Sequence, residues 1–251
     1  MSSSTLSGKV AIVTGASKGI GAGIAKLFAK SGASVVVNYA SSEAAAHALV
    51  AEIKGAGGKA VAIQADFSKT ADIRRLFEES KRAFGAIDIL VNNAGVYAFA
   101  PLQDATEQEF HREFSTNVLG VITATQEAAK HFGPDGGSII NISSIASVGF
   151  MPNSVVYAAT KSAVDSITRV TSVELAPKKI RVNSIAPGAT ITEGIAALGW
   201  PEEAVKSVVA SIPFGRPGQP EDIARVALFL ASDDSAWVTG ERITASGGQR
   251  A

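Results

Sequence analysis

The chain of 251 residues alternates between short apolar, β-branched segments and segments in which apolar residues recur at helical spacing. The apolar runs predict seven strands, at 9–14, 33–38, 59–66, 87–95, 138–144, 180–188 and 242–246. Helical spacing between these strands predicts helices that include 43–54, 107–132, 156–176 and 220–232. Glycine- and proline-rich stretches, such as GPDGG at 133–137, are expected to end them.

This alternation predicts an α/β fold, a doubly wound seven-stranded parallel sheet of the Rossmann type. No linker or repeat divides the chain, so we expect a single domain over 1–251, with a less regular substrate-loop segment at about 189–219. Ligands of such sheets bind beyond the carboxyl ends of the strands, where the strand order reverses. The functional residues should therefore follow strands.

The charge balance narrows the choice of partners. Lys and Arg number 23, as do Asp and Glu, which argues against a nucleic-acid or anionic-membrane surface. The chain has no cysteine, no signal-peptide pattern, no apolar run of about 18 residues that could span a membrane, and no histidine and carboxylate cluster at metal-ligand spacing. We expect a cytoplasmic protein with no metal, membrane or nucleic-acid partner.

A glycine-rich turn, TGASKGIG at 14–21, follows the first predicted strand and precedes a helix. Gly15, Gly19 and Gly21 would allow a tight turn and a close approach of backbone N–H groups to phosphate. The helix N-terminus adds partial positive charge for a pyrophosphate. The spacing differs from the commoner G-x-G-x-x-G, but its strand–turn–helix context favours dinucleotide binding.

The same stretch also matches the G-x-S-x-G nucleophile elbow of serine hydrolases, with Ser17 as the nucleophile. A hydrolase of that fold needs a histidine late in the chain. The three histidines are His47, His111 and His131, and none lies in the last 120 residues. We therefore rank a hydrolase well below a nucleotide-dependent enzyme.

A second candidate is YAATK at 157–161, which would place Tyr157 and Lys161 on one face of a helix. This spacing alone is weak, because an ordinary helix surface can carry such a pair. A free phenol has a pKa of about 10, which matches neutral pH poorly. An ammonium one turn away, together with a positively charged nicotinamide, would lower that pKa and suit the phenol to proton transfer.

Taken together, TGASKGIG, NNAG, NVLG, SS…YAATK and PGATIT resemble the short-chain dehydrogenase/reductase family over essentially the whole chain. The resemblance is strongest to NADP(H)-dependent carbonyl reductases, ketoreductases and glucose dehydrogenase-like members. It implies four catalytic residues, Ser144, Tyr157, Lys161 and Asn117. The family's serine lies 13 residues before the tyrosine, which selects Ser144 over Ser143. In these roles Ser144 would hold the carbonyl oxygen, Lys161 would bind the nicotinamide ribose, and Asn117 would bind a water of the proton relay. The alternative is structural: Ser144 would only cap a turn, and Asn117 would be a polar residue inside a helix.

The resemblance and the strand ends imply a larger set of cofactor-binding residues. They are Gly15, Ser17, Lys18, Gly19, Ile20, Gly21, Asn38, Tyr39, Ser41, Ser42, Asp66, Phe67, Asn93, Ala94, Gly95, Tyr157, Lys161, Pro187, Gly188, Thr190 and Thr192. Near the C-terminus, TASGGQ carries Ala-Ser where many relatives have Val-Asp, which puts the subunit contacts in doubt.

The end of the second strand favours NADP(H) over NAD(H). A bare ribose is usually held there by Asp or Glu, whereas this strand ends at Asn38. Lys18, Ser41 and Ser42 could bind a 2′-phosphate, although Lys18 could also be a solvated turn residue and the serines a helix cap. On this interpretation, Asn38→Asp with Lys18→Ala should shift the preference toward NADH.

Apolar residues near the strand ends suggest a pocket for neutral ketones or aldehydes, bulky or aromatic ones included, rather than keto acids. They are Tyr97, Phe99, Phe150, Met151, Ile195, Ala196, Ala197, Leu198 and Trp200, and no arginine occurs from 182 to 215. These residues could instead pack in the core or between subunits. The resemblance further implies a homotetramer, with a dimer as the alternative.

Two other functions stay open at this point. One is an NADP(H)-sensing regulator without catalysis, which would not need to keep Ser144, Tyr157 and Lys161. The other is an epimerase or dehydratase on the same fold, which would form product without net consumption of NADPH.

Overall fold

The structure, a computed structural model, describes residues 5–196, 199 and 201–250. One parallel sheet carries seven strands in the order β3-β2-β1-β4-β5-β6-β7. The strands are β1 (Val10–Val13), β2 (Ser34–Tyr39), β3 (Lys59–Gln64), β4 (Ile89–Asn92), β5 (Gly137–Ile142), β6 (Ile180–Pro187) and β7 (Arg242–Ala245). The α-helices are α1 (Gly19–Lys30), α2 (Glu43–Gly55), α3 (Thr70–Phe84), α4 (Glu107–Phe114), α5 (Gly120–His131), α6 (Val155–Leu175), α7 (Glu193–Ala196), α8 (Glu202–Ala210) and α9 (Pro220–Ala231).

The strand order confirms the doubly wound parallel sheet. The chain winds from β1 outward to β3, crosses back to β4 and then winds outward to β7. In the centre of the sheet Val13 pairs with Val37 of β2 on one side and with Val91 of β4 on the other. The order therefore reverses between β1 and β4, where a ligand site is expected.

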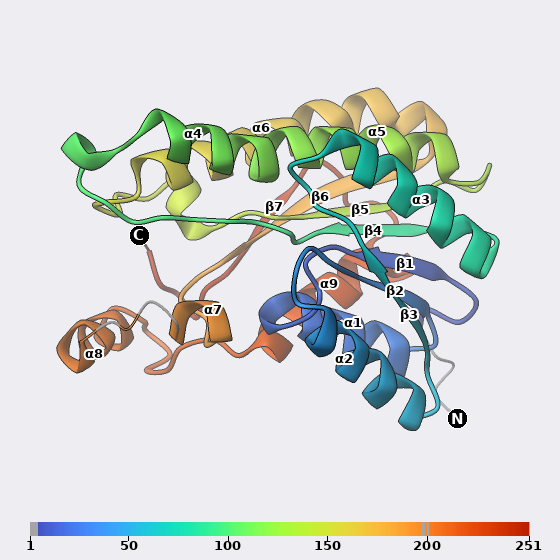
Figure 1. Cartoon of the computed structure of the whole chain (residues 1–251), viewed down its shortest axis with the longest axis horizontal. Helices are drawn as coiled ribbons and strands as arrows, with labels where there is room; N and C mark the ends of the chain where they lie inside the picture. The colour runs from blue at the N-terminus through green and yellow to red at the C-terminus, as the bar shows by residue number, and fades with distance from the viewer. Residues whose placement is uncertain (1–4, 197–198, 200, 251) are drawn as a thin grey trace.

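Helices cover both faces of the sheet, which explains why its central strands are largely apolar. In Figure 1, α3, α4, α5 and α6 lie above the sheet, and α1, α2 and α9 lie below it. Phe28 of α1 belongs to a core below the sheet, and Phe77 of α3 belongs to a core above it. Burial of each such side chain stabilises the fold by roughly 1.5–3 kcal/mol.

Two parts of the chain differ from the sequence-based expectation. The helix expected at 107–132 is interrupted by a π-helical turn, Ser115–Leu119, between α4 and α5. The segment 189–219 contains α7 and α8, which project from the rest of the molecule in Figure 1. Over the described residues, no helix is both long enough and apolar enough to cross a bilayer.

Candidate active site

The glycine turn after β1 packs directly against the turn after β4. A Cβ on Gly15 would lie 2.9 Å from the Cα of Ala94, and one on Gly21 would lie 2.5 Å from Nδ2 of Asn93. Asn93 Nδ2 donates to the carbonyls of Thr14, at 2.8 Å, and Gly15, at 3.0 Å. The turn therefore has no room for a side chain at Gly15 or Gly21, and Asn93 fixes its backbone.

The first turn of α1 already holds a carboxylate. The N–H of Gly19 donates to Oε2 of Glu193 in α7 at 3.0 Å, while Lys18 at the N-cap gives no side-chain cap bond. A cavity of about 440 Å³ lies here between α1 and residues 191–193. Free N–H groups and the helix dipole make this position suitable for an anion. The position therefore fits a pyrophosphate, with Glu193 as its competitor.

The side chain of Asn38 makes internal contacts that the sequence analysis did not predict. Its side chain is buried, and its Oδ1 accepts from the N–H of Gly15 at 3.1 Å. Its Nδ2 faces the carbonyls of Tyr39, Ile63 and Ala65 at 3.1–3.3 Å. Asn38 thus joins the glycine turn to β2 and β3. Asn38→Asp would place a carboxylate among carbonyl oxygens, which makes it a poor test of cofactor choice.

The residues that follow Asn38 remain candidates for the adenosine end of a cofactor. Tyr39 is buried, Ser41 is exposed and Ser42 is the N-cap residue of α2 without a side-chain cap bond. The exposed Lys18 lies at the start of α1, at the same edge of the sheet. The serine hydroxyls are therefore not used as helix caps and are left available for a phosphate.

The turn after β3 contributes two of the predicted residues in different ways. Asp66 accepts from the backbone N–H and the hydroxyl of Ser68, at 2.9 Å and 2.7 Å. Although burial opposes it, these bonds and the charge of Lys69 lower the pKa of Asp66. Phe67 is buried in the core, so only its backbone could contact a cofactor.

Ser144, Tyr157 and Lys161 come together beyond the end of β5. Ser144 has an extended backbone, and its Oγ accepts from the N–H of Ala146 at 3.1 Å. The Nζ of Lys161 lies 5.7 Å from the ring centroid of Tyr157 and donates to the carbonyl of Ile142 at 2.8 Å. The strand end and the first turns of α6 therefore assemble the three predicted catalytic side chains.

The protein's own groups do not lower the pKa of the phenol as expected. Burial raises the pKa of Tyr157 to about 12, although its hydrogen bond with Ser144 lowers it. Burial also lowers the pKa of Lys161 to about 8, against the raising effect of the Asp165 and Glu113 carboxylates. Desolvation thus outweighs the short distance between the two groups, and Tyr157 is a protonated donor at neutral pH.

Asn117 lies in the π-helical turn and is buried. Its Oδ1 accepts from the N–H of Val96 at 2.8 Å, and its Nδ2 donates to the Val96 carbonyl at 2.7 Å. A Cβ on Gly95 would lie 3.3 Å from Oδ1 of Asn117 and 3.6 Å from Nζ of Lys161. The Asn117 side chain therefore fixes Gly95 and Val96 beside Lys161. This is a structural role, which the sequence analysis gave as the alternative for Asn117.

The segment after β6 meets the glycine turn from the other side. The N–H of Gly188 donates to the Ala245 carbonyl at 3.0 Å, and the Thr190 hydroxyl donates to the Gly188 carbonyl at 2.9 Å. A Cβ on Gly19 would lie 3.2 Å from Cγ2 of Thr192. Pro187 is buried at the end of β6. Three strand ends therefore surround one site.

Aromatic rings lie beside the candidate proton donor. The ring centroids of Tyr97 and Phe99 are each 5.9 Å from that of Tyr157, with edge-on geometry. Met151 is half-buried, whereas Phe150 is 93% exposed. The backbones of Ile195 and Ala196 lie in α7. The prediction for Ala197, Leu198 and Trp200 falls outside the described residues.

Sequence reasoning missed Glu113 and Arg112 of α4. Glu113 is buried, and its Oε1 accepts from the N–H of Ala98 at 2.8 Å, while its Oε2 has no partner among the described residues. Arg112 Nη2 donates to the carbonyl of Tyr97 at 3.2 Å, so the two side chains hold both ends of one peptide unit. Burial and the nearby Glu109 raise the pKa of Glu113 to about 7. No local pattern marks a glutamate on an amphipathic helix as buried.

The hydrolase alternative gains no support from the geometry. The three histidines lie on α2, α4 and α5 and contact glutamates: Glu43 at 3.8 Å, Glu107 at 3.4 Å and Glu78 at 3.2 Å. Within the described part of the chain, none hydrogen-bonds to Ser17.

Comparisons with known proteins agree with this arrangement. Residues 15–250 match a protein family described as enoyl-(acyl carrier protein) reductase. An uncharacterized oxidoreductase of Methylorubrum extorquens is 57% identical over 98% of this chain and all of that protein. The angucycline C-6 ketoreductase LanV with bound NADP has a TM-score of 0.92 at 39% identity, covering 97% of this chain and 96% of its own. A 7α-hydroxysteroid dehydrogenase complexed with NADH and 7-oxo glycochenodeoxycholic acid has a TM-score of 0.94 at 38% identity, covering 99% and 96%. With its glycine turn, its parallel sheet and its Ser144, Tyr157 and Lys161 cluster, the chain is an oxidoreductase that belongs to the short-chain dehydrogenase/reductase family.

Proposed function

We propose that this oxidoreductase transfers a hydride between NADP(H) and a carbonyl or secondary alcohol, and that it reduces neutral ketones or aldehydes. The observation that carries the proposal is the assembly of Tyr157, hydrogen-bonded to Ser144 and one helical turn from the buried Lys161. When bound, the nicotinamide supplies or accepts the hydride. Tyr157 gives a proton to the carbonyl oxygen, and the Ser144 hydroxyl holds and polarises that oxygen.

The residues that would hold the cofactor follow from the described strand ends. The glycine turn and the N-terminus of α1 suit the pyrophosphate, the backbone near Asp66 suits the adenine, and Lys161 suits the nicotinamide ribose. Gly188 and Thr192, beside the turn, suit the nicotinamide. Asn117 would keep Gly95 and Val96 in place beside Lys161, and its own water contact remains a proposal.

The preference for NADP(H) rests on the charges near the end of β2. Residues 39–42 carry no carboxylate, and Lys18 supplies a positive charge at the same edge. LanV, with bound NADP, supports this preference, while the hydroxysteroid dehydrogenase was complexed with NADH. The test is the ratio of kcat/KM for NADPH and NADH on one good substrate. An equal or higher value with NADH contradicts the preference.

The substrate class rests on the aromatic rings around Tyr157. Tyr97 and Phe99 present apolar surface beside the phenol, and the range 182–215 has no arginine to bind a carboxylate. Both structural neighbours are named with polycyclic compounds, an angucycline and 7-oxo glycochenodeoxycholic acid, which supports a bulky substrate, although the second compound carries a carboxyl group. We expect bulky or aromatic neutral ketones to be reduced faster than small α-keto acids, and a substrate panel measured by NADPH consumption tests this.

The same panel separates the competing functions. A sensor would bind NADPH without turnover, and an epimerase or dehydratase would form product without net NADPH consumption. The intact set of Ser144, Tyr157 and Lys161 favours the reductase, because a sensor has no need of a proton donor. Detection of NADP⁺ and alcohol in equal amounts is the expected result.

We also propose a homotetramer in the cytoplasm, with a dimer as the alternative. Several apolar side chains on the outer helices are exposed, among them Leu119 at 49% and Val173 at 75%. Pairing of such helices between copies would bury them. Sedimentation at micromolar concentration tests the assembly, with a monomer as the contradicting result, and fractionation of cells tests the location.

A further inference from the structure

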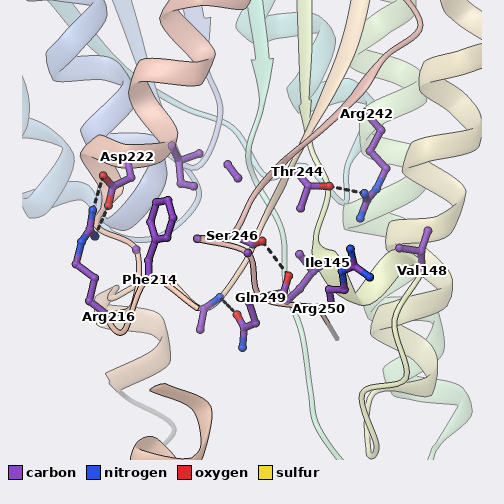
Figure 2. Close-up of a pocket in the computed structure, with 16 residues that line it drawn as sticks. Ile145, Val148, Phe214, Arg216, Asp222, Arg242, Thr244, Ser246, Gln249 and Arg250 are labelled. Carbon is purple, nitrogen blue, oxygen red and sulfur yellow. Dashed lines mark hydrogen bonds and ion pairs between the residues drawn. The ribbon is translucent and has the colours of Figure 1, made fainter. Parts of the chain in front are cut away.

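Arg242 of β7 contacts the backbone of Ser144, which follows β5 on the far side of β6. Its Nη2 donates to the Ser144 carbonyl at 3.1 Å, and its Nε lies 3.2 Å from the Ser147 hydroxyl. Its Nη1 donates to the Thr244 hydroxyl at 2.8 Å, as Figure 2 shows. The side chain forms part of the wall of a cavity of about 790 Å³, to which Ile145 and Val148 also contribute.

The same guanidinium forms a partly buried ion pair with Asp165 of α6. The Nε of Arg242 lies 3.0 Å from Oδ2 of Asp165, and the two side chains are 21% and 4% exposed. The other carboxylate oxygen accepts from the Ser184 hydroxyl at 3.2 Å. A buried carboxylate needs such partners, and the planar guanidinium holds several acceptors in fixed directions. The ion pair therefore locks Arg242 in one orientation.

Asp165 also acts on the catalytic lysine. It lies one helical turn after Lys161, and its negative charge raises the pKa of Lys161, as Glu113 also does, against the lowering effect of burial. Tyr157, a turn earlier, stays neutral to high pH. One ion pair thus contacts the backbone of Ser144 and sets part of the charge environment of Lys161.

We propose that Arg242 is a positioning residue that fixes the carbonyl, and hence the side-chain direction, of Ser144, and that its partner Asp165 keeps Lys161 charged. The Ser144 carbonyl accepts two hydrogen bonds, one from the Ser147 N–H at 3.1 Å and one from Arg242. The bond from Arg242 is the one that comes from a distant part of the chain. This proposal rests on the catalytic roles given above to Ser144 and Lys161.

The first test compares Arg242→Gln with Arg181→Gln. Arg181 is a matched control, since it is a partly buried arginine of the adjacent β6 that bonds to Ser235 and the Ser232 carbonyl. We expect Arg242→Gln to lower kcat by about 10- to 100-fold with the Kd for NADPH within twofold, and Arg181→Gln to leave kcat within twofold. Equal losses in the two variants, or a normal kcat in Arg242→Gln, would overturn the proposal.

Two further variants separate positioning from a loss of folding. Arg242→Gln combined with Asp165→Asn leaves no unpaired buried charge, so the protein should fold, and its kcat should stay low. Asp165→Asn alone should move the alkaline limb of the kcat/KM profile to lower pH, because Lys161 loses a raising influence on its pKa. Recovery of kcat in the double variant, or an unmoved limb in Asp165→Asn, would contradict the respective part. If Tyr157→Phe keeps full turnover, the proposed function itself is wrong. If Tyr157→Phe loses turnover while Arg242→Gln keeps a normal kcat, only this inference is wrong.

Discussion

The glycine turn and the segment at 189–219 border the same site but are built in opposite ways. At the turn, Cβ atoms on Gly15 or Gly21 would lie within 3 Å of Ala94 or Asn93. In α8, by contrast, no described residue is buried, and the side chains of Glu202 and Glu203 are more than 80% exposed. Dense packing fixes the backbone that would meet the cofactor, whereas α8, in the segment that would meet the substrate, buries none of its described side chains. The first region therefore has a recognisable sequence, and the second can vary with the substrate.

The largest effect should come from the centre that both regions serve. Tyr157→Phe keeps the ring but removes the proton donor, so kcat should fall by about 10² or more while NADPH still binds. Steady-state turnover and NADPH fluorescence titration measure the two quantities. A kcat near that of the unmutated protein would show that the chemistry lies elsewhere.

Equal glycine substitutions in the two regions should have unequal results. Gly21→Ala meets Asn93 and the Gly15 carbonyl at 2.5 and 2.7 Å, so it should cost about 1–3 kcal/mol of stability and weaken NADPH binding. For Gly194→Ala in α7 the one described atom within 3 Å of the added Cβ is the Tyr97 hydroxyl oxygen at 2.7 Å, the end of a side chain that can move. Its Tm should change little, while KM for the ketone changes. A larger loss of Tm in Gly194→Ala would contradict the contrast in packing.

Glu113 supports residues between the two regions, and its ionisation should be visible in stability. The folded carboxyl keeps its proton to about pH 7, whereas the unfolded one releases it near 4.5. The folded state therefore binds more protons in this range, and the free energy of unfolding falls as pH rises from about 4.5 to 7. Glu113→Gln cannot ionise, so it avoids this loss of unfolding free energy, and its amide oxygen can still accept from the N–H of Ala98. The variant should be more stable than the unmutated protein by on the order of 2 kcal/mol at pH 8, with little difference at pH 4.5.

Urea unfolding at the two pH values measures this effect. Glu203→Gln, in α8 with an 85% exposed side chain beside Lys206, is the control and should show little pH-dependent difference, because its lysine partner keeps its charge over this range. An advantage of Glu113→Gln that is the same at both pH values would mean that its carboxyl is not the titrating group.

A change of cofactor preference sharpens the view of the packed region. The side chain of Asn38 is held by hydrogen bonds within the protein, so we place the carboxylate at the exposed position 40 instead. The test variant is Ala40→Asp combined with Lys18→Ala. Repulsion of a 2′-phosphate and loss of the lysine should shift the NADPH to NADH ratio of kcat/KM by about tenfold, close to 1.4 kcal/mol. Thermal melting confirms that the fold is kept. A ratio unchanged in this double variant would place the 2′-phosphate contacts elsewhere.

The smallest effect is expected where the two regions touch. The Glu193 carboxylate occupies the N–H of Gly19 at the start of α1 and would compete with a pyrophosphate. Glu193→Gln should strengthen NADPH binding about two- to fivefold, the scale of a charge at a helix end. Glu202→Gln, exposed in α8, is its control. Weaker binding in Glu193→Gln would mean that the carboxylate helps to hold the segment over the cofactor.

The sequence predicted the fold and the proximity of Ser144, Tyr157 and Lys161, because both depend on local patterns. Apolar runs give strands, and the glycine turn at 14–21 and YAATK, taken together with NNAG, NVLG and PGATIT, carry the resemblance to the family. The inward orientation of Asn38 could not be read, since both faces of β2 are buried and alternation carries no information there. The support of Ser144 by Arg242 joins residues 98 positions apart, and no local pattern reports such a contact.

The π-helical turn at Ser115–Leu119 has a consequence for the ancestry and redesign of this chain. Such a turn closes its hydrogen bonds over one residue more than an α-helical turn does. Deleting one of its residues should let a regular α-helix run through and leave α5 facing nearly as it does now, because the wider turn absorbs the extra residue. Asn117, whose amide now brackets Val96, would then turn away from it. In an alignment of related sequences, those with a one-residue gap at 115–119 should lack the asparagine that corresponds to Asn117, and those without the gap should keep it.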